Sequence, residues 1–187
     1  MHRREKSFKN ITFIFFVIFT IWIFLQFLAP LSVQKGSVRD LSGTVLFFDN
    51  KDKFNDMPIF ISNVYFAGDI LCHQKPERSF FINENQMPFC SRCTAIWLGF
   101  AIGLGFMVFY FIELNEKFLF LLILSIIPIG IDGVGQLFGY WESSNIIRLI
   151  TGLLVGIFCG VALGVIFDEI KTFNFFKKNQ KVIKKRK

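Results

Sequence analysis

Residues 146–167 read IIRLITGLLVGIFCGVALGVIF, a continuous apolar run that contains a single charged side chain, Arg148. A helix needs about 20 mostly apolar residues to cross the roughly 30 Å hydrocarbon core of a bilayer, and this run has that length. Three further runs of similar character cover residues 11–28, 93–112 and 118–138. The sequence therefore predicts an all-α integral membrane protein with four transmembrane helices.

The composition supports a membrane location. The chain has 187 residues, of which 53% are hydrophobic and 19% charged, whereas soluble domains are about half apolar and about a quarter charged. The net charge of +7 comes from the two ends, because residues 1–10 carry four cations against one anion and residues 168–187 carry eight against two. The interior is slightly acidic, which argues against a nucleic-acid partner.

The chain divides into five parts by composition. Residues 1–10 form a basic cytoplasmic end, 11–30 a transmembrane anchor, 31–64 an extracytoplasmic loop, 65–167 a core with three transmembrane helices, and 168–187 a basic cytoplasmic tail. The anchor is predicted to stay uncleaved, because it exceeds a usual signal-peptide core and no small-x-small site follows. Residues 59–71 are apolar but too short to span, which indicates an interfacial or re-entrant segment.

The orientation follows from the distribution of Lys and Arg, which favours cationic ends in the cytoplasm. Four spans place both basic ends on the same side of the cell membrane. Residues 31–92, with seven cations and seven anions, are then predicted to lie outside. The turn at 139–144 also lies outside, and the hairpin at 113–117 lies inside.

Four thiol and imidazole side chains fall within this outer segment: Cys72, His73, Cys90 and Cys93. Three chemistries fit them. A Cys-x-x-Cys pair with a distant Cys and His can hold zinc or another thiophilic metal, although adjacent Cys72 and His73 reach one ion with difficulty. The same thiols could exchange disulfides, or form a structural disulfide that ties the loop down. We expect Cys72, Cys90 and Cys93 to lie within about 10 Å of one another, because a metal site or an exchangeable disulfide requires near contact.

A resemblance supports the choice of these residues. CHQKPERSF at 72–80 and PFCSRCT at 88–94 resemble the signature CHQxPxRSF…CxRC of an uncharacterised family of small archaeal and bacterial polytopic membrane proteins. The resemblance covers residues 65–165 and includes further matches at Pro128, Ile131-Asp132-Gly133, Gln136, Gly139, Ser144-Asn145, Arg148 and Thr151-Gly152. Because that family is a domain of unknown function, the resemblance implies a boundary and candidate residues, and no activity.

Polar residues inside the third and fourth spans are the candidate catalytic residues: Asp132, Gln136, Asn145 and Arg148. Asp132 lies roughly 21 Å from the inner end of its span at about 1.5 Å per residue, in the outer leaflet, where an ionised group is costly unless paired or hydrated. We expect Asp132 and Arg148 to converge in a polar pocket that opens outward. Asp132 would act as a general acid or base, and Arg148 would hold an anionic group.

Glycines indicate how the helices pack. Gly152, Gly156, Gly160 and Gly164 recur at intervals of four in the fourth span, and Gly99 and Gly103 offer an opposing notch in the second. Small residues at such spacing allow two membrane helices to approach closely. Arg78 and Arg92 are predicted to add cationic groups beside the cysteines.

The leading hypothesis is an outward-facing membrane enzyme that acts on an amphiphilic or anionic substrate. Its centre would be a Cys/His metal or thiol group, and membrane lipid would surround it. The alternative is a small transporter or structural scaffold whose outer loop is tied by a disulfide. Motifs for nucleotide binding, serine hydrolases and HExxH zinc proteases are missing from the sequence. The pattern leaves the cofactor unidentified, with zinc as one candidate.

Overall fold

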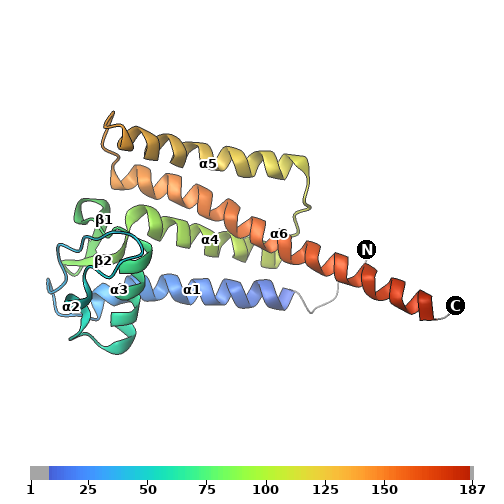
Figure 1. The fold of residues 1–187 in the computed structure, drawn as a ribbon, viewed down its shortest axis with the longest axis horizontal. Coiled ribbons are helices and arrows are strands. Elements are labelled where there is room, and N and C mark those ends of the chain that lie inside the picture. The colour runs from blue at the N-terminus through green and yellow to red at the C-terminus, as the bar shows by residue number, and fades with distance from the viewer. Residues whose placement is uncertain (1–8, 186–187) are drawn as a thin grey trace.

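The structure is a computed structural model that describes residues 9–185. Four long helices lie side by side in it: α1 (Lys9–Leu31), α4 (Ser91–Phe109), α5 (Glu116–Leu137) and α6 (Asn145–Lys185) (Figure 1). All four are long and apolar enough to cross a membrane. The predicted fold class is therefore confirmed, and the predicted spans match the helices to within a few residues at most ends.

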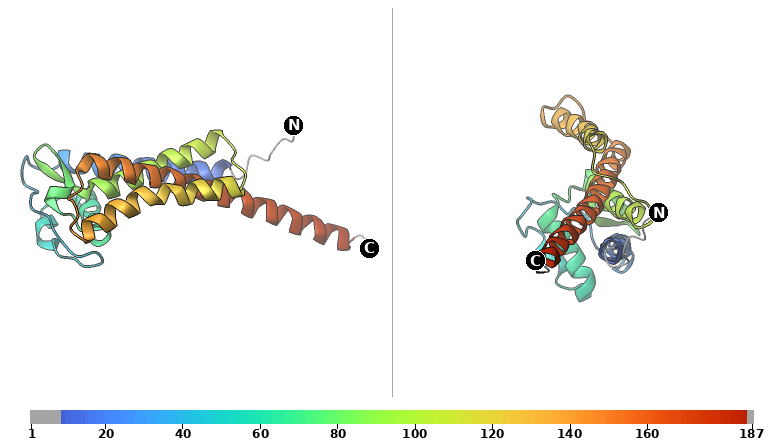
Figure 2. Two further views of the ribbon diagram at one scale, coloured as in Figure 1. Left: turned by 90° about the horizontal axis from the view of Figure 1, so that it is seen from above. Right: turned by 90° about the vertical axis from the view of Figure 1, so that its right-hand side faces the viewer.

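The helices are arranged in the order α1, α4, α6, α5, as the end-on view in Figure 2 shows. α6 lies between α4 and α5, whereas α1 contacts mainly α4. The apolar part of α6 reaches Ile170, and the helix itself continues to Lys185, beyond the bundle. The sequence placed the end of this span at Phe167, so the helix is longer than its membrane-spanning part.

α4 and α6 approach each other through glycines on both helices. A Cβ atom added at Gly99 would lie 2.4 Å from the Leu153 carbonyl oxygen, and one added at Gly156 would lie 2.3 Å from the Ile96 carbonyl oxygen. Gly103 and Gly160 face the opposite backbone in the same way. The two backbones are thus in direct contact, which confirms the packing that the glycine spacing predicts.

The segment between α1 and α4 folds into a small module at one end of the bundle. Its elements are α2 (Lys51–Phe54), α3 (Ile59–Leu71), the short 3₁₀ helix η1 (Pro76–Arg78), and the antiparallel strands β1 (Ser79–Ile82) and β2 (Asn85–Cys90). The all-α prediction did not include this hairpin. Residues 44–48 form no strand, because Leu46 adopts a positive φ of 74° in a turn.

Buried amide side chains hold the module together. Gln74 donates from Nε2 to the Pro88 carbonyl oxygen at 2.8 Å, and the Leu41 N–H donates to Gln86 Oε1 at 2.9 Å. Asn85 donates to the carbonyl oxygen of Pro30, in the last turn of α1, at 2.9 Å. All three amides are fully buried. Because a buried polar group is costly without a partner, these bonds fix α1, the loop and β2 relative to one another.

α3 lies across the end of the bundle rather than along it (Figure 1). Gly68 lets α3 approach β2, since a Cβ there would lie 2.0 Å from the Pro88 carbonyl oxygen. Tyr65 of α3 stacks on Phe54, and its hydroxyl donates to the Gln86 carbonyl oxygen at 2.8 Å. These contacts hold α3 against β2. The chain leaves α3 at Leu71 and continues to Cys72.

We expect Gly156→Ala to destabilise the bundle by about 2 kcal/mol, the scale of overpacking in a close-packed interior, because the new methyl group meets the α4 backbone. Thermal unfolding of the purified protein in detergent, followed by circular dichroism, measures this change. Gly130→Ala is the matched control, since nothing lies within 4 Å of a Cβ at that position. Equal stability of the two variants would contradict the glycine contact.

Candidate functional site

Three cysteines from three different elements meet beneath the module. Cys72 follows α3, Cys90 ends β2, and Cys93 lies in the first turn of α4. Their sulfur atoms all lie within 4.8 Å of one another. The predicted convergence of these cysteines is confirmed. The fourth cysteine, Cys159 in α6, is not a member of this group.

The cysteine cluster is shielded from solvent. Cys72 and Cys90 are each 2% exposed, and Phe89, Trp22 and Trp97 pack around them. The Cys90 N–H donates to Cys72 Sγ at 3.3 Å. A tetrahedral zinc site with Zn–S bonds of about 2.3 Å places its sulfurs about 3.8 Å apart. The spacing of the three thiols is close to what such a site requires.

The thiols affect one another's ionisation. The thiols of Cys72 and then Cys93, which can hydrogen-bond a Cys90 thiolate, lower the pKa of Cys90 well below its usual range. The bond to Cys90 and then burial raise the pKa of Cys72 to about 11. Cys90 is thus the thiol of this pair that first becomes a thiolate, the form that ligates metals and attacks disulfides.

His73 lies beside the cysteine cluster but outside its sulfur triangle. Cys72 has an extended backbone (φ −145°, ψ 147°), and successive side chains on an extended chain point to opposite faces. The His73 Nδ1 accepts from the Lys75 N–H at 3.2 Å, so a neutral ring carries its proton on Nε2. After the neighbouring thiols, hydrogen bonding to His73 also lowers the pKa of Cys90. Metal ligation by His73 remains a prediction.

Asp132 forms an ion pair with Arg92, in the first turn of α4. Arg148, which we expect to converge with Asp132, lies within electrostatic range of this carboxylate but is not its ion-pair partner. The Arg92 side chain reaches α5 from the start of α4, and a Cβ at Gly133 would lie 3.8 Å from Arg92 Nη1. Asp132 is buried, and the Arg92 side chain is 24% exposed. The carboxylate that the sequence placed in the outer leaflet thus has a counter-ion from a neighbouring helix.

Asn145 and Gln136, the other two predicted residues, hold Arg148 in place. Its Nη1 donates to Asn145 Oδ1 at 3.0 Å. With its amide oxygen turned toward the donors, Gln136 accepts from Arg148 Nη2 at 2.6 Å and from the Ser143 N–H at 2.9 Å. The structure therefore brings Gln136, Asn145 and Arg148 together across the α5–α6 turn. Arg148 is only 5% exposed.

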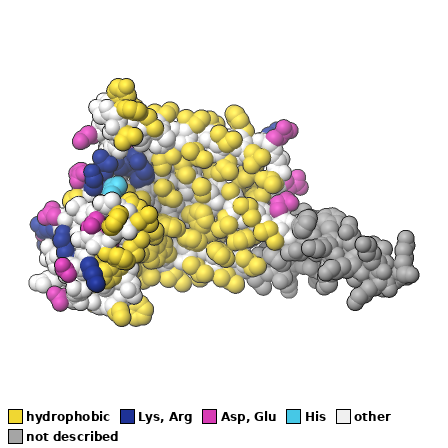
Figure 3. All heavy atoms as spheres, viewed as in Figure 1, with side chains coloured by type: hydrophobic (Ala, Val, Ile, Leu, Met, Phe, Trp, Pro, Cys, Tyr) yellow, Lys and Arg dark blue, Asp and Glu magenta, His cyan; other side chains and the backbone are white. Residues whose placement is uncertain are grey.

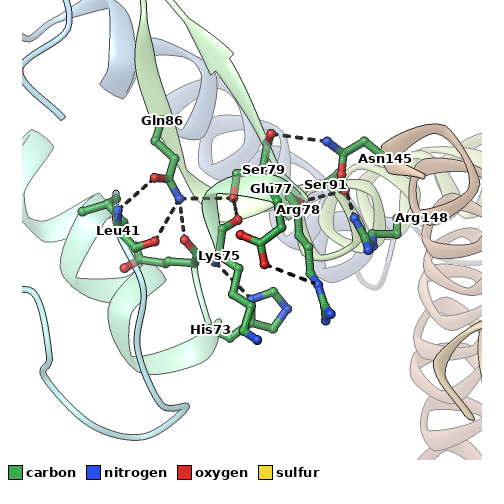
Figure 4. A network of polar contacts seen from close by, with 11 residues as sticks. Leu41, His73, Lys75, Glu77, Arg78, Ser79, Gln86, Ser91, Asn145 and Arg148 are labelled. Carbon is green, nitrogen blue, oxygen red and sulfur yellow. Dashed lines mark hydrogen bonds and ion pairs between the residues drawn. The ribbon is translucent and has the colours of Figure 1, made fainter. Parts of the chain in front are cut away.

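A third arginine reaches the same place from the module. Figure 4 shows the Arg78 guanidinium between the His73 ring and Arg148. Ser91 Oγ lies 3.0 Å from the Arg78 carbonyl oxygen and 3.0 Å from Asn145 Oδ1, so its one hydroxyl proton is shared between these two acceptors. Arg148 lies within electrostatic range of Arg78, Arg92, Asp132 and Cys90. We call Arg78, Arg92 and Arg148 the arginine cluster.

Basic side chains are grouped on the surface near the module. Figure 3 shows Lys and Arg side chains beside a histidine, between the module and the C-terminal end of α5, with an apolar surface next to them. An apolar groove of about 720 Å³ also lies on α5, but neither Asp132 nor Arg148 lines it. The sequence missed Arg92 as the partner of Asp132. The predicted span at residues 93–112 offered a signal for this partner, because it places Arg92 at the start of a helix.

The chain is similar to known proteins over the residues that form this site. A family model described as a predicted membrane protein, DUF2085, matches residues 72–162. Uncharacterized protein MJ1492 of Methanocaldococcus jannaschii is 35% identical over 155 residues, which cover 81% of this chain and 86% of that protein. An uncharacterized protein of Methanothermobacter thermautotrophicus is 41% identical over 87 residues, 46% of this chain and 78% of its own. No solved structure matches the chain.

We expect Asp132→Asn to lower the stability of the protein by about 2 kcal/mol, less than a fully buried broken pair costs because Arg92 is partly exposed. The double variant Asp132→Asn/Arg92→Gln should recover much of that loss, since it removes the uncompensated charge. Chemical unfolding in detergent measures both. Lys35→Gln, which removes an exposed pair with Glu84, is the control with little effect. Additive losses in the double variant would contradict the ion pair.

Proposed function

This chain belongs to the family of predicted membrane proteins described as DUF2085, and from that premise we propose that it is a membrane enzyme with a thiolate metal centre. Cys72, Cys90 and Cys93 hold a thiophilic ion such as zinc at the outer surface of the membrane. The substrate is an amphiphile that enters from the bilayer, because the centre lies at the end of the apolar spans. The observation that carries this proposal is the convergence of three thiols, two of them buried, within 4.8 Å.

A metal explains three thiols better than a disulfide does. A disulfide uses two sulfurs and leaves the third without a purpose, whereas zinc binds three or four protein ligands. Three thiolates leave one tetrahedral position for His73, which gives a closed structural site, or for water and substrate, which gives a catalytic site. When bound, such an ion supplies a Lewis acid or an activated water molecule.

The residues around the centre have separate roles in this proposal. Arg148 binds an anionic group of the substrate, while Gln136 and Asn145 orient its guanidinium. Asp132 holds Arg92 in place, so it acts as a positioning residue unless substrate binding releases it as an acid or base. His73 directs a ring N–H toward Cys90, or serves as the fourth ligand.

The metal content of the purified protein tests this function. We expect about one thiophilic metal ion per chain, lost in Cys90→Ser and Cys93→Ser and retained in the matched control Cys159→Ser. Elemental analysis and counting of reactive thiols under denaturing conditions measure the metal and the redox state together. A metal-free protein with two fewer titratable thiols would establish the disulfide scaffold instead.

The proposed orientation puts the cysteine cluster outside the cell membrane and both basic ends in the cytoplasm. The cations of residues 1–10 and 168–187 support it. We expect green fluorescent protein fused after residue 187 to fluoresce and alkaline phosphatase fused there to be inactive, because phosphatase folds only outside. Alkaline phosphatase inserted in the 139–144 turn should be active. The opposite pattern would place the thiols in the cytoplasm.

A further inference from the structure

We infer that the arginine cluster is a binding site for a phosphate-type dianion, the head group of the substrate. This inference rests on the proposed function only in making the anion part of a substrate. The binding site itself follows from the charge, burial and geometry of Arg78, Arg92 and Arg148. It lies beside the cysteine cluster, since Arg148 is within electrostatic range of Cys90.

The charges of the arginine cluster do not balance. Three guanidinium groups share one buried carboxylate, Asp132, which is engaged by Arg92. Glu77 approaches Arg78 at 4.0 Å, but its side chain is 64% exposed, where solvent screens the interaction. Among the described residues, two of these guanidinium groups thus have no buried carboxylate of their own, and a dianion supplies two negative charges.

The hydrogen-bonding groups of the cluster are also incompletely satisfied. The Nε atoms of Arg92 and Arg148 are buried and have no partner among the described residues. Arg148 is 95% buried, with only its two terminal nitrogens engaged by Asn145 and Gln136. An unpaired buried donor costs free energy that an anion with several acceptor oxygens recovers.

The shape of the cluster favours a tetrahedral anion over a carboxylate. A carboxylate is satisfied by one guanidinium fork, whereas guanidinium groups that arrive from η1, α4 and α6 offer donors to a group with more oxygens. Ser91 begins α4 beside Arg92, so the positive end of that helix dipole adds to the attraction. A phosphate monoester carries up to two negative charges near neutral pH, which matches the excess charge.

Free phosphate and a lipid phosphate present the same chemistry, and binding measurements separate them. Calorimetric titration of the detergent-purified protein with inorganic phosphate reports the bare anion. Native mass spectrometry with dioleoyl phosphatidic acid, against dioleoyl phosphatidylcholine, reports an amphiphile. We expect saturable binding of phosphate and selective retention of phosphatidic acid, because the monoester is the group that carries the second charge.

The variant Arg78→Gln should weaken both ligands at least about tenfold, since each charge-assisted bond is worth about one such factor or more. Arg39→Gln is the matched control, because Arg39 pairs with Glu84 at an exposed site, and it should change binding less than about twofold. Arg148→Lys keeps the charge and removes the fork, so it should also weaken binding. Equal affinities in all of these variants would overturn the inference.

The variant Cys90→Ser/Cys93→Ser separates this inference from the metal centre. Phosphate binding that persists in this variant places the anion on the arginines, even where elemental analysis finds no metal in the wild-type protein. Phosphate binding that disappears with the thiols, while the arginines are intact, places the anion on the metal and overturns the inference. Absence of binding in the wild-type protein overturns it as well.

Discussion

The contact between the backbones of α4 and α6 is the constraint on which the site depends. Gly99 and Gly156 let the two helices touch without intervening side chains, and a larger residue at either position would push them apart. This contact fixes the first turn of α4, with Arg92 and Cys93, beside the N-terminal end of α6, with Arg148. Because van der Waals packing replaces the hydrophobic effect between helices in lipid, the same glycines stabilise the bundle and set the geometry of its polar end.

The module completes the site from the other side. Its buried amides satisfy backbone groups that a loop at a membrane surface would otherwise leave unpaired. Gln74 is an example, because its side chain donates to the Pro88 carbonyl oxygen. Its own backbone forms a turn with a positive φ of 44°. That turn reverses the chain immediately after Cys72 and His73, which leaves Cys72 facing Cys90 and leads onward to Arg78. In the CHQxPxRSF segment, Cys72, His73 and Arg78 thus lie at the candidate site, whereas Gln74 holds the module together.

The cysteine and arginine clusters stabilise each other electrostatically. Arg148 is within range of both Cys90 and Asp132, and a thiolate in an apolar environment is favoured by nearby positive charge. The arginines in turn are costly to bury without anions around them. The thiols and the guanidinium groups therefore lie in one polar site, and in the function that we propose a negatively charged group of the substrate binds the arginines close to the sulfurs.

The amino-acid sequence alone specifies the four spans, the glycines at intervals of four in α6 and the grouping of the cysteines. Bilayer thickness, helical spacing and thiol chemistry act locally or along one helix, so these features can be predicted from it. The pairing of Asp132 cannot be, since Arg92 and Arg148 are both plausible partners by depth, and the crossing of α4 on α6 selects Arg92. The β1–β2 hairpin was also missed, because its fully buried second strand lacks the alternation that identifies strands. The convergence of Arg78 with Arg92 and Arg148 depends on how η1, α4 and α6 meet, and that relation exists only in three dimensions.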